Sequence, residues 1–176
     1  MARVGGIDVG ARLGIGLIAP DEVRSGSFQF IDGWYPFGRQ AVEWERRLQE
    51  QLDDFRFDHV GIARQFLRKG KKSHDTPKNL IPMYWAFGTV LKICHQRGIQ
   101  THWIQEMDAR SLMLGKKNMP QKSEALKAAV NRACKDRGWP CCDYDASDAL
   151  CIAAAVVEQL NPGAGHQTSP LFAAAP

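Results

Sequence analysis

The stretch Val4-Gly-Gly-Ile-Asp-Val-Gly10 places a carboxylate, Asp8, inside a run of apolar and β-branched residues that is typical of a buried β-strand. An unpaired carboxylate in such a strand is costly, so it requires a compensating partner. Near the other end of the chain, Asp145-Ala-Ser-Asp148 begins an alanine-rich apolar run, and residues at i and i+3 share one face of a helix. If this face meets the first strand, three carboxylates converge. Ligation by oxygen alone favours Mg²⁺ or Mn²⁺.

The composition is that of an ordinary globular protein, with 44% hydrophobic and 24% charged residues in a chain of 176. This length favours one domain, which we place at residues 1–160, followed by a Pro-, Gly- and Ala-rich tail at 161–176. The five cysteines form no CxxC pair, which argues against a disulfide framework or a zinc site and favours a reducing cytoplasm. We find no apolar run of ~18 residues and no secretory leader, so we expect no membrane span.

Basic residues gather in two segments, although the net charge is only +4. The segment Arg64–Lys72 has five basic residues and no acid, and Arg110–Arg137 has eight basic residues against two acids. Such segments are also typical of a solvated surface. Together with an acidic metal cluster, however, they favour a polyanionic partner such as nucleic acid.

The pattern of apolar residues and turn signals predicts an α/β fold with a five-stranded mixed sheet flanked by helices. The first three strands are expected to form an antiparallel meander. We predict strands at Arg3–Val9, Leu13–Ala19, Val23–Ile31, His59–Phe66 and Ile99–Ile104, and helices at Gln40–Phe55, Leu80–Arg97, Asp108–Met113, Lys122–Arg137 and Tyr144–Leu160.

The predicted helix Leu80–Arg97 is apolar on more than one face. One face can pack on the sheet, and the surplus indicates a surface for a partner, including a second copy of the chain. A centrally buried helix explains the same pattern, and both interpretations stay open.

Four segments, in this order, resemble the RuvC family of Holliday junction resolvases in the RNase H-like superfamily. The resemblance runs from about Arg3 to Leu160, although actin-like ATPases begin with a similar first strand. It implies an RNase H-like fold and a homodimeric endonuclease that resolves four-way DNA junctions by paired metal-dependent nicks in recombination and repair. The segments are Gly6-Ile7-Asp8-Val9-Gly10, Gly61-Ile62 to Phe66 with its basic loop, Gln121-Lys122-Ser123, and Asp145-x-x-Asp148-Ala-Leu-x-Ile-Ala.

The family's site of four carboxylates falls on Asp8, Asp145, Asp148 and position 63, and the resemblance implies that it holds two Mg²⁺ or Mn²⁺ ions. At position 63 the family has Glu, whereas this chain has Ala63. The chain is therefore either an active-site variant of an active enzyme or a catalytically deficient protein that binds branched DNA. We expect it to bind junctions but cleave them poorly, and we expect Ala63→Glu to restore nicking.

The resemblance also implies which residues contact DNA. Phe66 is expected to stack on bases near the crossover, although a core position at a strand end is the alternative. Lys122 and Arg110 fall near the positions of family lysines. We expect phosphate contacts from the basic residues of the loop after the fourth strand: Arg64, Arg68, Lys69, Lys71 and Lys72.

The acids have simpler roles as alternatives. Asp8 can be a turn carboxylate at a strand end, and Asp145 can cap the last helix. Asp143 is expected to be a solvated neighbour, and the histidines show no ligand spacing.

Overall fold

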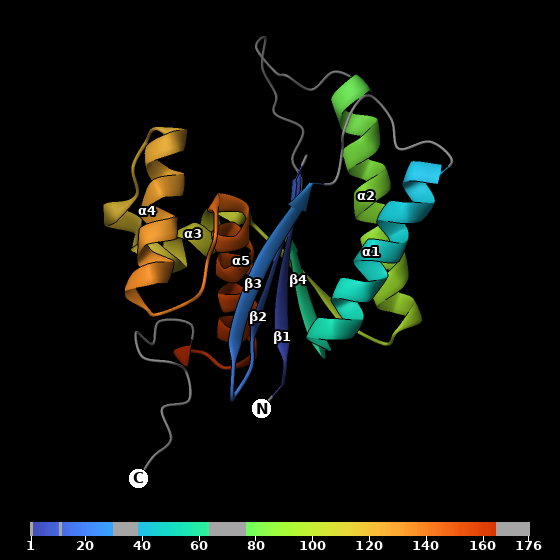
Figure 1. Cartoon of the computed structure of the whole chain (residues 1–176). Coiled ribbons are helices and arrows are strands. Elements are labelled where there is room, and N and C mark those ends of the chain that lie inside the picture. The colour runs from blue at the N-terminus through green and yellow to red at the C-terminus, as the bar shows by residue number, and fades with distance from the viewer. Residues whose placement is uncertain (1, 11, 30–38, 64–76, 165–176) are drawn as a thin grey trace.

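The computed structural model describes residues 2–10, 12–29, 39–63 and 77–164, and it contains one five-stranded mixed sheet (Figure 1). The strand order is β3-β2-β1-β4-β5, in which β1–β2 and β2–β3 pair antiparallel and β1–β4 and β4–β5 pair parallel. The predicted α/β class and mixed sheet are confirmed. The strands are β1 (Val4–Val9), β2 (Arg12–Ile18), β3 (Val23–Gln29), β4 (His59–Ala63) and β5 (Gln100–Ile104).

The helices cover both faces of the sheet and give three layers (Figure 1). On one side lie α1 (Arg39–Phe55) and α2 (Pro77–Gln96); on the other lie α3 (Glu106–Leu114), α4 (Ser123–Asp136) and α5 (Tyr144–Leu160). A short 3₁₀ turn, Lys116–Asn118, joins α3 to α4. Among the described residues, no helix is long and apolar enough to cross a membrane.

Most predicted boundaries agree with the observed ones to within one or two residues. Helix α2 begins three residues earlier than predicted, at Pro77, which suits a first helical turn because that turn does not need the proline N–H. Helix α3 begins two residues earlier than predicted, at Glu106. The described part of the fourth strand ends at Ala63, and residues 64–66 of the prediction lie outside the described residues.

Strand β1 sends its side chains alternately to the two layers. Ile7 and Val9 belong to the core on the α1 and α2 side, together with Leu48 and Leu52 of α1. Val4 belongs to the second core, which contains most of α5. By the same alternation Gly6 and Asp8 face α5, so the acid of β1 points into the layer that carries the second acidic segment.

Helix α5 lies directly against glycines of β1 and β2. A Cβ atom at Gly6 would collide with the Ala149 carbonyl oxygen and lie 2.6 Å from the Ala153 nitrogen. A Cβ at Gly14 would collide with the Asp145 carbonyl, and one at Gly16 would lie 2.9 Å from the Leu150 nitrogen. Because these neighbours are backbone atoms of one helix, they cannot move separately, and only glycine allows α5 this close to the sheet.

We therefore predict that Gly6→Ala destabilises the fold by about 1–3 kcal/mol or more, the usual cost of overpacking a core. The matched control is Gly26→Ala in β3, where the new Cβ would lie 3.9 Å from its nearest neighbour, Ile15 Cγ2. Urea unfolding of the two variants measures the difference. Equal stability of the two variants would contradict the close contact between α5 and β1.

Candidate active site

The structure brings Asp8 to the end of α5 that carries the other two predicted acids. Asp8 pairs with Gly14 in the β1–β2 ladder, and Gly14 is the glycine that lies against the Asp145 backbone. Asp148 follows on the same helix face and is only 2% exposed. Asp8 itself is half-buried. Asp145 and Asp148 both act electrostatically on Asp8, so three carboxylates from distant parts of the sequence lie toward one end of the sheet.

A buried arginine, Arg110 of α3, holds Asp148 in a two-point ion pair. Its Nε donates to Asp148 Oδ1 at 3.0 Å, and its Nη2 donates to Oδ2 at 2.7 Å. The same Nη2 also contacts Glu106, one turn earlier on α3. Burial opposes the positive charge, but the hydrogen bonds and charge of Asp148, with further help from Glu106 and Asp8, raise the pKa of Arg110.

The electrostatics of Asp8 reflect this crowding of negative charge. Its pKa is raised to about 7, first because burial disfavours the charged form and then because Asp148, Glu106 and Asp145 add negative charge nearby. The Arg110 guanidinium acts in the opposite sense. With a pKa of about 7, the Asp8 carboxyl group is only partly ionised near neutral pH, and an added positive charge would favour its ionised form.

Asp145 lies closer to solvent and has a different partner. Arg12 of β2 approaches Asp145 at 3.3 Å and Asp143 at 3.3 Å, and its side chain is 45% exposed. Burial is the largest cause that raises the pKa of Asp145, while Lys127 and Arg12 lower it. The ion-pair partner of Asp145 is thus a partly exposed arginine, whereas the partner of Asp148 is a buried one.

Asp143, rather than Asp145, caps α5. The Asp143 carboxylate accepts a hydrogen bond from the Ala146 N–H at 2.9 Å and another from the Ser27 hydroxyl. Burial acts to raise the pKa of Asp143, but these hydrogen bonds and Arg12 outweigh it and lower the pKa. The expectation that Asp143 is merely solvated was wrong, and Asp145 is left without a capping role.

Position 63 holds no acid, but a fourth carboxylate stands nearby. Ala63 is buried at the end of β4 and packs in the α5-side core with Ile104. Glu106, which the sequence analysis missed, belongs to the first turn of α3, directly after β5. The sequence did contain one indication of this role: Glu106 comes just after the predicted strand Ile99–Ile104, and that strand runs parallel to β4.

The predicted DNA-contacting residues are placed only in part. Arg110 is buried and engaged by Asp148 and Glu106, and Lys122 is exposed just before α4. Their contacts with DNA stay predictions. The other six predicted residues, Arg64, Phe66, Arg68, Lys69, Lys71 and Lys72, lie outside the described residues.

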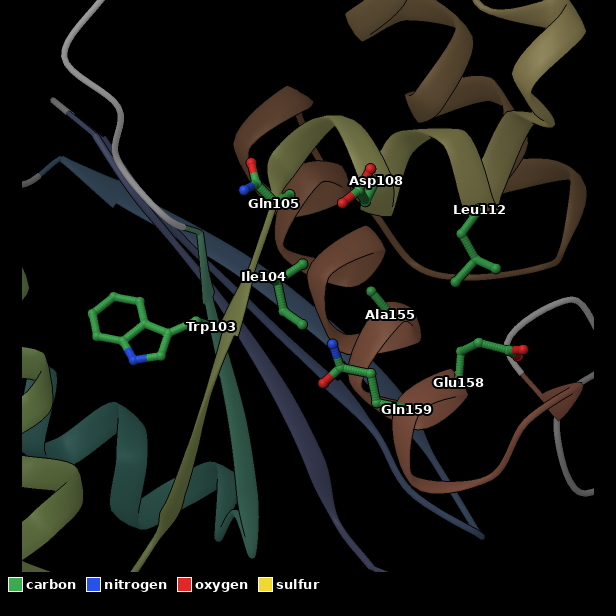
Figure 2. Close-up of a pocket in the computed structure, with 8 residues that line it drawn as sticks. All are labelled: Trp103, Ile104, Gln105, Asp108, Leu112, Ala155, Glu158 and Gln159. Atoms are coloured by element: carbon green, nitrogen blue, oxygen red, sulfur yellow. The ribbon is translucent and has the colours of Figure 1, made fainter.

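A hollow of about 290 Å³ lies between the end of β5, α3 and the later turns of α5, and its lining does not include the clustered acids. It is lined by Trp103 and Gln105 at the end of β5, by Asp108 and Leu112 of α3, and by residues of α5 (Figure 2). Figure 2 shows α3 starting at the end of β5, with Asp108 on the side of the hollow. Asp108 and Glu106 both lie in the first turn of α3, but Asp108 lines the hollow whereas Glu106 contacts Arg110.

The clustered acids fit a divalent cation in the kind of donor they offer. All are hard oxygen donors, and the raised pKa of Asp8 shows a negative charge that a cation would relieve. The Arg110 guanidinium already supplies one positive charge between Asp148 and Glu106. In the present arrangement, no three acids, histidines or cysteines among the described residues form a ready-made metal site.

Comparison with known proteins identifies the fold. No family model and no curated protein matches the chain. Thermus thermophilus RuvC in complex with a Holliday junction substrate superposes with a TM-score of 0.64 at 21% identity, covering 92% of this chain and 97% of that one. A second structure of Thermus thermophilus RuvC gives 0.63 at 21%, covering 90% and 96%. The yeast mitochondrial Holliday junction resolvase Ydc2 gives 0.51 at 15%, covering 86% and 76%. The protein has the RuvC-like, RNase H-like fold, as predicted.

We predict that Arg110→Met costs about 3–5 kcal/mol of folding free energy, because it strands the buried Asp148 charge. The matched control, Arg12→Met, removes a partly exposed partner of Asp145 and is expected to cost about 0–1 kcal/mol. Because Arg110→Met/Asp148→Leu removes both charges, it should regain much of the loss. Denaturant unfolding measures all three, and equal losses for the two single variants would show that the Arg110 pair is not buried as described.

The raised pKa of Asp8 predicts a pH-dependent stability. Between about pH 4 and pH 7 the folded protein keeps a proton that the unfolded chain has lost, so in EDTA its stability falls as the pH rises through this window. Asp8→Asn removes this dependence and should be more stable than the unchanged chain above pH 7, by at most on the order of 4 kcal/mol because Asp8 is not fully buried. The stability advantage of Asp8→Asn should vanish below pH 4.

Unfolding measurements from pH 4 to 8 test this prediction, with the exposed Asp136→Asn as the control. A stability advantage of Asp8→Asn that stays constant across this range would contradict it.

Proposed function

We propose that this protein is a structure-selective endonuclease that hydrolyses phosphodiester bonds in branched DNA, with the four-way junction as its substrate. One observation supports the proposal: Asp8 of β1 lies within electrostatic reach of Asp145 and Asp148 of α5 at one end of a RuvC-like sheet. A structure of the same fold is in complex with a Holliday junction substrate, which supports this choice of DNA. The proposed setting is DNA recombination and repair in the cytoplasm.

The proposed chemistry depends on divalent cations, Mg²⁺ or Mn²⁺, in the two-ion form that the resemblance implies. When bound, such ions activate water and neutralise the charge that develops on the phosphate and the leaving oxygen. Asp8, Asp145 and Asp148 would hold them. Asp8 is suited to this role because a cation would favour its charged form, which burial and the neighbouring acids disfavour, and Arg110 holds Asp148 through two hydrogen bonds.

Basic side chains would hold the DNA backbone around the acids. Arg12 is exposed and lies beside Asp145, and Lys127 acts electrostatically on Asp145. Lys122 is exposed just before α4, and the basic segment Arg64–Lys72 follows β4 in the sequence. Contacts of this kind release counterions from DNA, so binding weakens steeply with salt.

A homodimer is part of the proposal, because two symmetric nicks across a two-fold junction require two related active sites. Helix α2 supplies the suggested interface. Ala86, Val90 and Ile93 of this helix are buried within the chain, whereas Tyr84 is 51% exposed. The neighbouring Trp103 is 53% exposed and stacks on Phe87 at 4.9 Å. Exposed aromatic groups of this kind are favoured at protein interfaces.

The second candidate function is a branched-DNA-binding protein without efficient cleavage. Ala63 favours it, because a small apolar side chain occupies the end of β4, where the resembling family has a carboxylate. The two functions differ only in catalysis, since both require the basic surface.

One experiment tests both candidates. We expect the unmodified chain to bind a four-way junction more tightly than a linear duplex of equal length, with affinity falling as salt rises. With Mg²⁺ or Mn²⁺, the nuclease proposal predicts junction nicking that Asp8→Asn and Asp148→Asn abolish without loss of binding. If only Ala63→Glu nicks junctions, the deficient binding protein is the correct function. Equal affinity for junction and duplex would contradict the proposed substrate.

A further inference from the structure

One positive group links two acids at the edge of the candidate site. Arg110 Nη2 contacts Glu106 Oε1 and also lies 2.7 Å from Asp148 Oδ2. The two carboxylates therefore approach a single positive centre from different sides. Glu106 and Asp148 are therefore members of one acidic cluster, with a single guanidinium nitrogen in contact with both.

The sheet register explains how Glu106 arrives there. The parallel strands β1, β4 and β5 end at the same edge, where Ile7 pairs with Ile62 and Ala63 pairs with Ile104. Asp8 follows Ile7, and α3 begins at Glu106, two residues beyond Ile104. An acid just past the end of β5 can thus reach the region that a longer side chain at position 63 would occupy.

Resting on the proposed nuclease function, we propose that Glu106 is the fourth acid of the candidate active site and that it helps Asp8 and Asp148 to hold a divalent cation.

The differing burial of the three partners is consistent with this role. Arg110 and Asp148 form a fixed buried pair, whereas the Glu106 side chain is 45% exposed and can reorient. A carboxylate has about four lone-pair sites on its two oxygens, so Asp148 can accept from Arg110 and still offer a lone pair to a cation. Glu106 can turn from Arg110 toward the cation while the buried pair stays intact.

The test is a calorimetric titration of the unmodified 176-residue chain and its variants with Mn²⁺, without DNA. We expect Glu106→Gln to weaken Mn²⁺ binding about tenfold or more, as is usual when a metal site loses a supporting group, and Asp8→Asn to weaken it as well. The matched control is Asp108→Asn, which removes an acid from the same turn of α3 but on the side of the hollow, and it should bind Mn²⁺ like the unmodified chain. Thermal unfolding in EDTA verifies that each variant is folded.

The outcomes separate this inference from the proposed function. If Asp8→Asn loses Mn²⁺ affinity and Glu106→Gln does not, Glu106 is not part of the site, and the nuclease proposal stands. Equal losses for Glu106→Gln and Asp108→Asn would also overturn the inference, because the effect would be one of general charge. So would a complete lack of Mn²⁺ binding by the unmodified chain. If Mn²⁺ binding depends on Glu106 but the chain neither binds nor nicks junctions, the inference holds and the proposed function fails.

Discussion

The close contact between α5 and the glycines of β1 and β2 is the constraint on which the candidate site depends. Gly6, Gly14 and Gly16 bring the helix backbone against the strands, and no larger residue fits at these positions without moving the helix. Asp145 lies directly over Gly14, and Gly14 pairs with Asp8. The distance between the acids of the two chain ends is therefore fixed by backbone packing, which is stiffer than any contact between side chains.

That packing brings several carboxylates together, and two arginines compensate part of their negative charge. Asp148 is buried and compensated by the equally buried Arg110, whereas Asp145 is compensated by the more exposed Arg12. Within the part of the chain that the structure describes, Asp8 has no comparable ion pair, and its pKa rises to about 7. Burial and the neighbouring acids thus disfavour the charged form of this carboxyl group on the central strand. A buried, incompletely compensated acid lowers stability, and such strain is typical of functional sites.

Residues whose roles depend on local pattern were predictable from sequence. Alternation in β1 predicted Asp8 within a buried strand, and the i, i+3 spacing predicted Asp145 and Asp148 on one face of α5, whereas their convergence was a condition that depends on the tertiary structure. Residues whose roles depend on pairing between distant segments were not. Glu106 reaches the site because β5 runs parallel to β4. Arg110 was expected to contact DNA, and its buried pairing with Asp148, 38 positions along the chain, could not be read from local pattern. The pairing of His59 with His102, at 3.0 Å, likewise arises from the parallel β4–β5 register.

The same register changes how the vacancy at position 63 should be interpreted. A carboxylate at the end of β4 and one just beyond β5 approach the same edge of the sheet, since Ala63 and Ile104 are paired neighbours. The proposed metal-dependent hydrolysis requires enough carboxylates around Asp8, and in this fold more than one strand ends where it can place a carboxylate there. Glu106 raises the pKa of Asp8, as Asp148 and Asp145 do, so its carboxylate already lies close enough to act on Asp8. Loss of an acid from one strand therefore does not by itself imply loss of the site, because a neighbouring parallel strand ends at the same place.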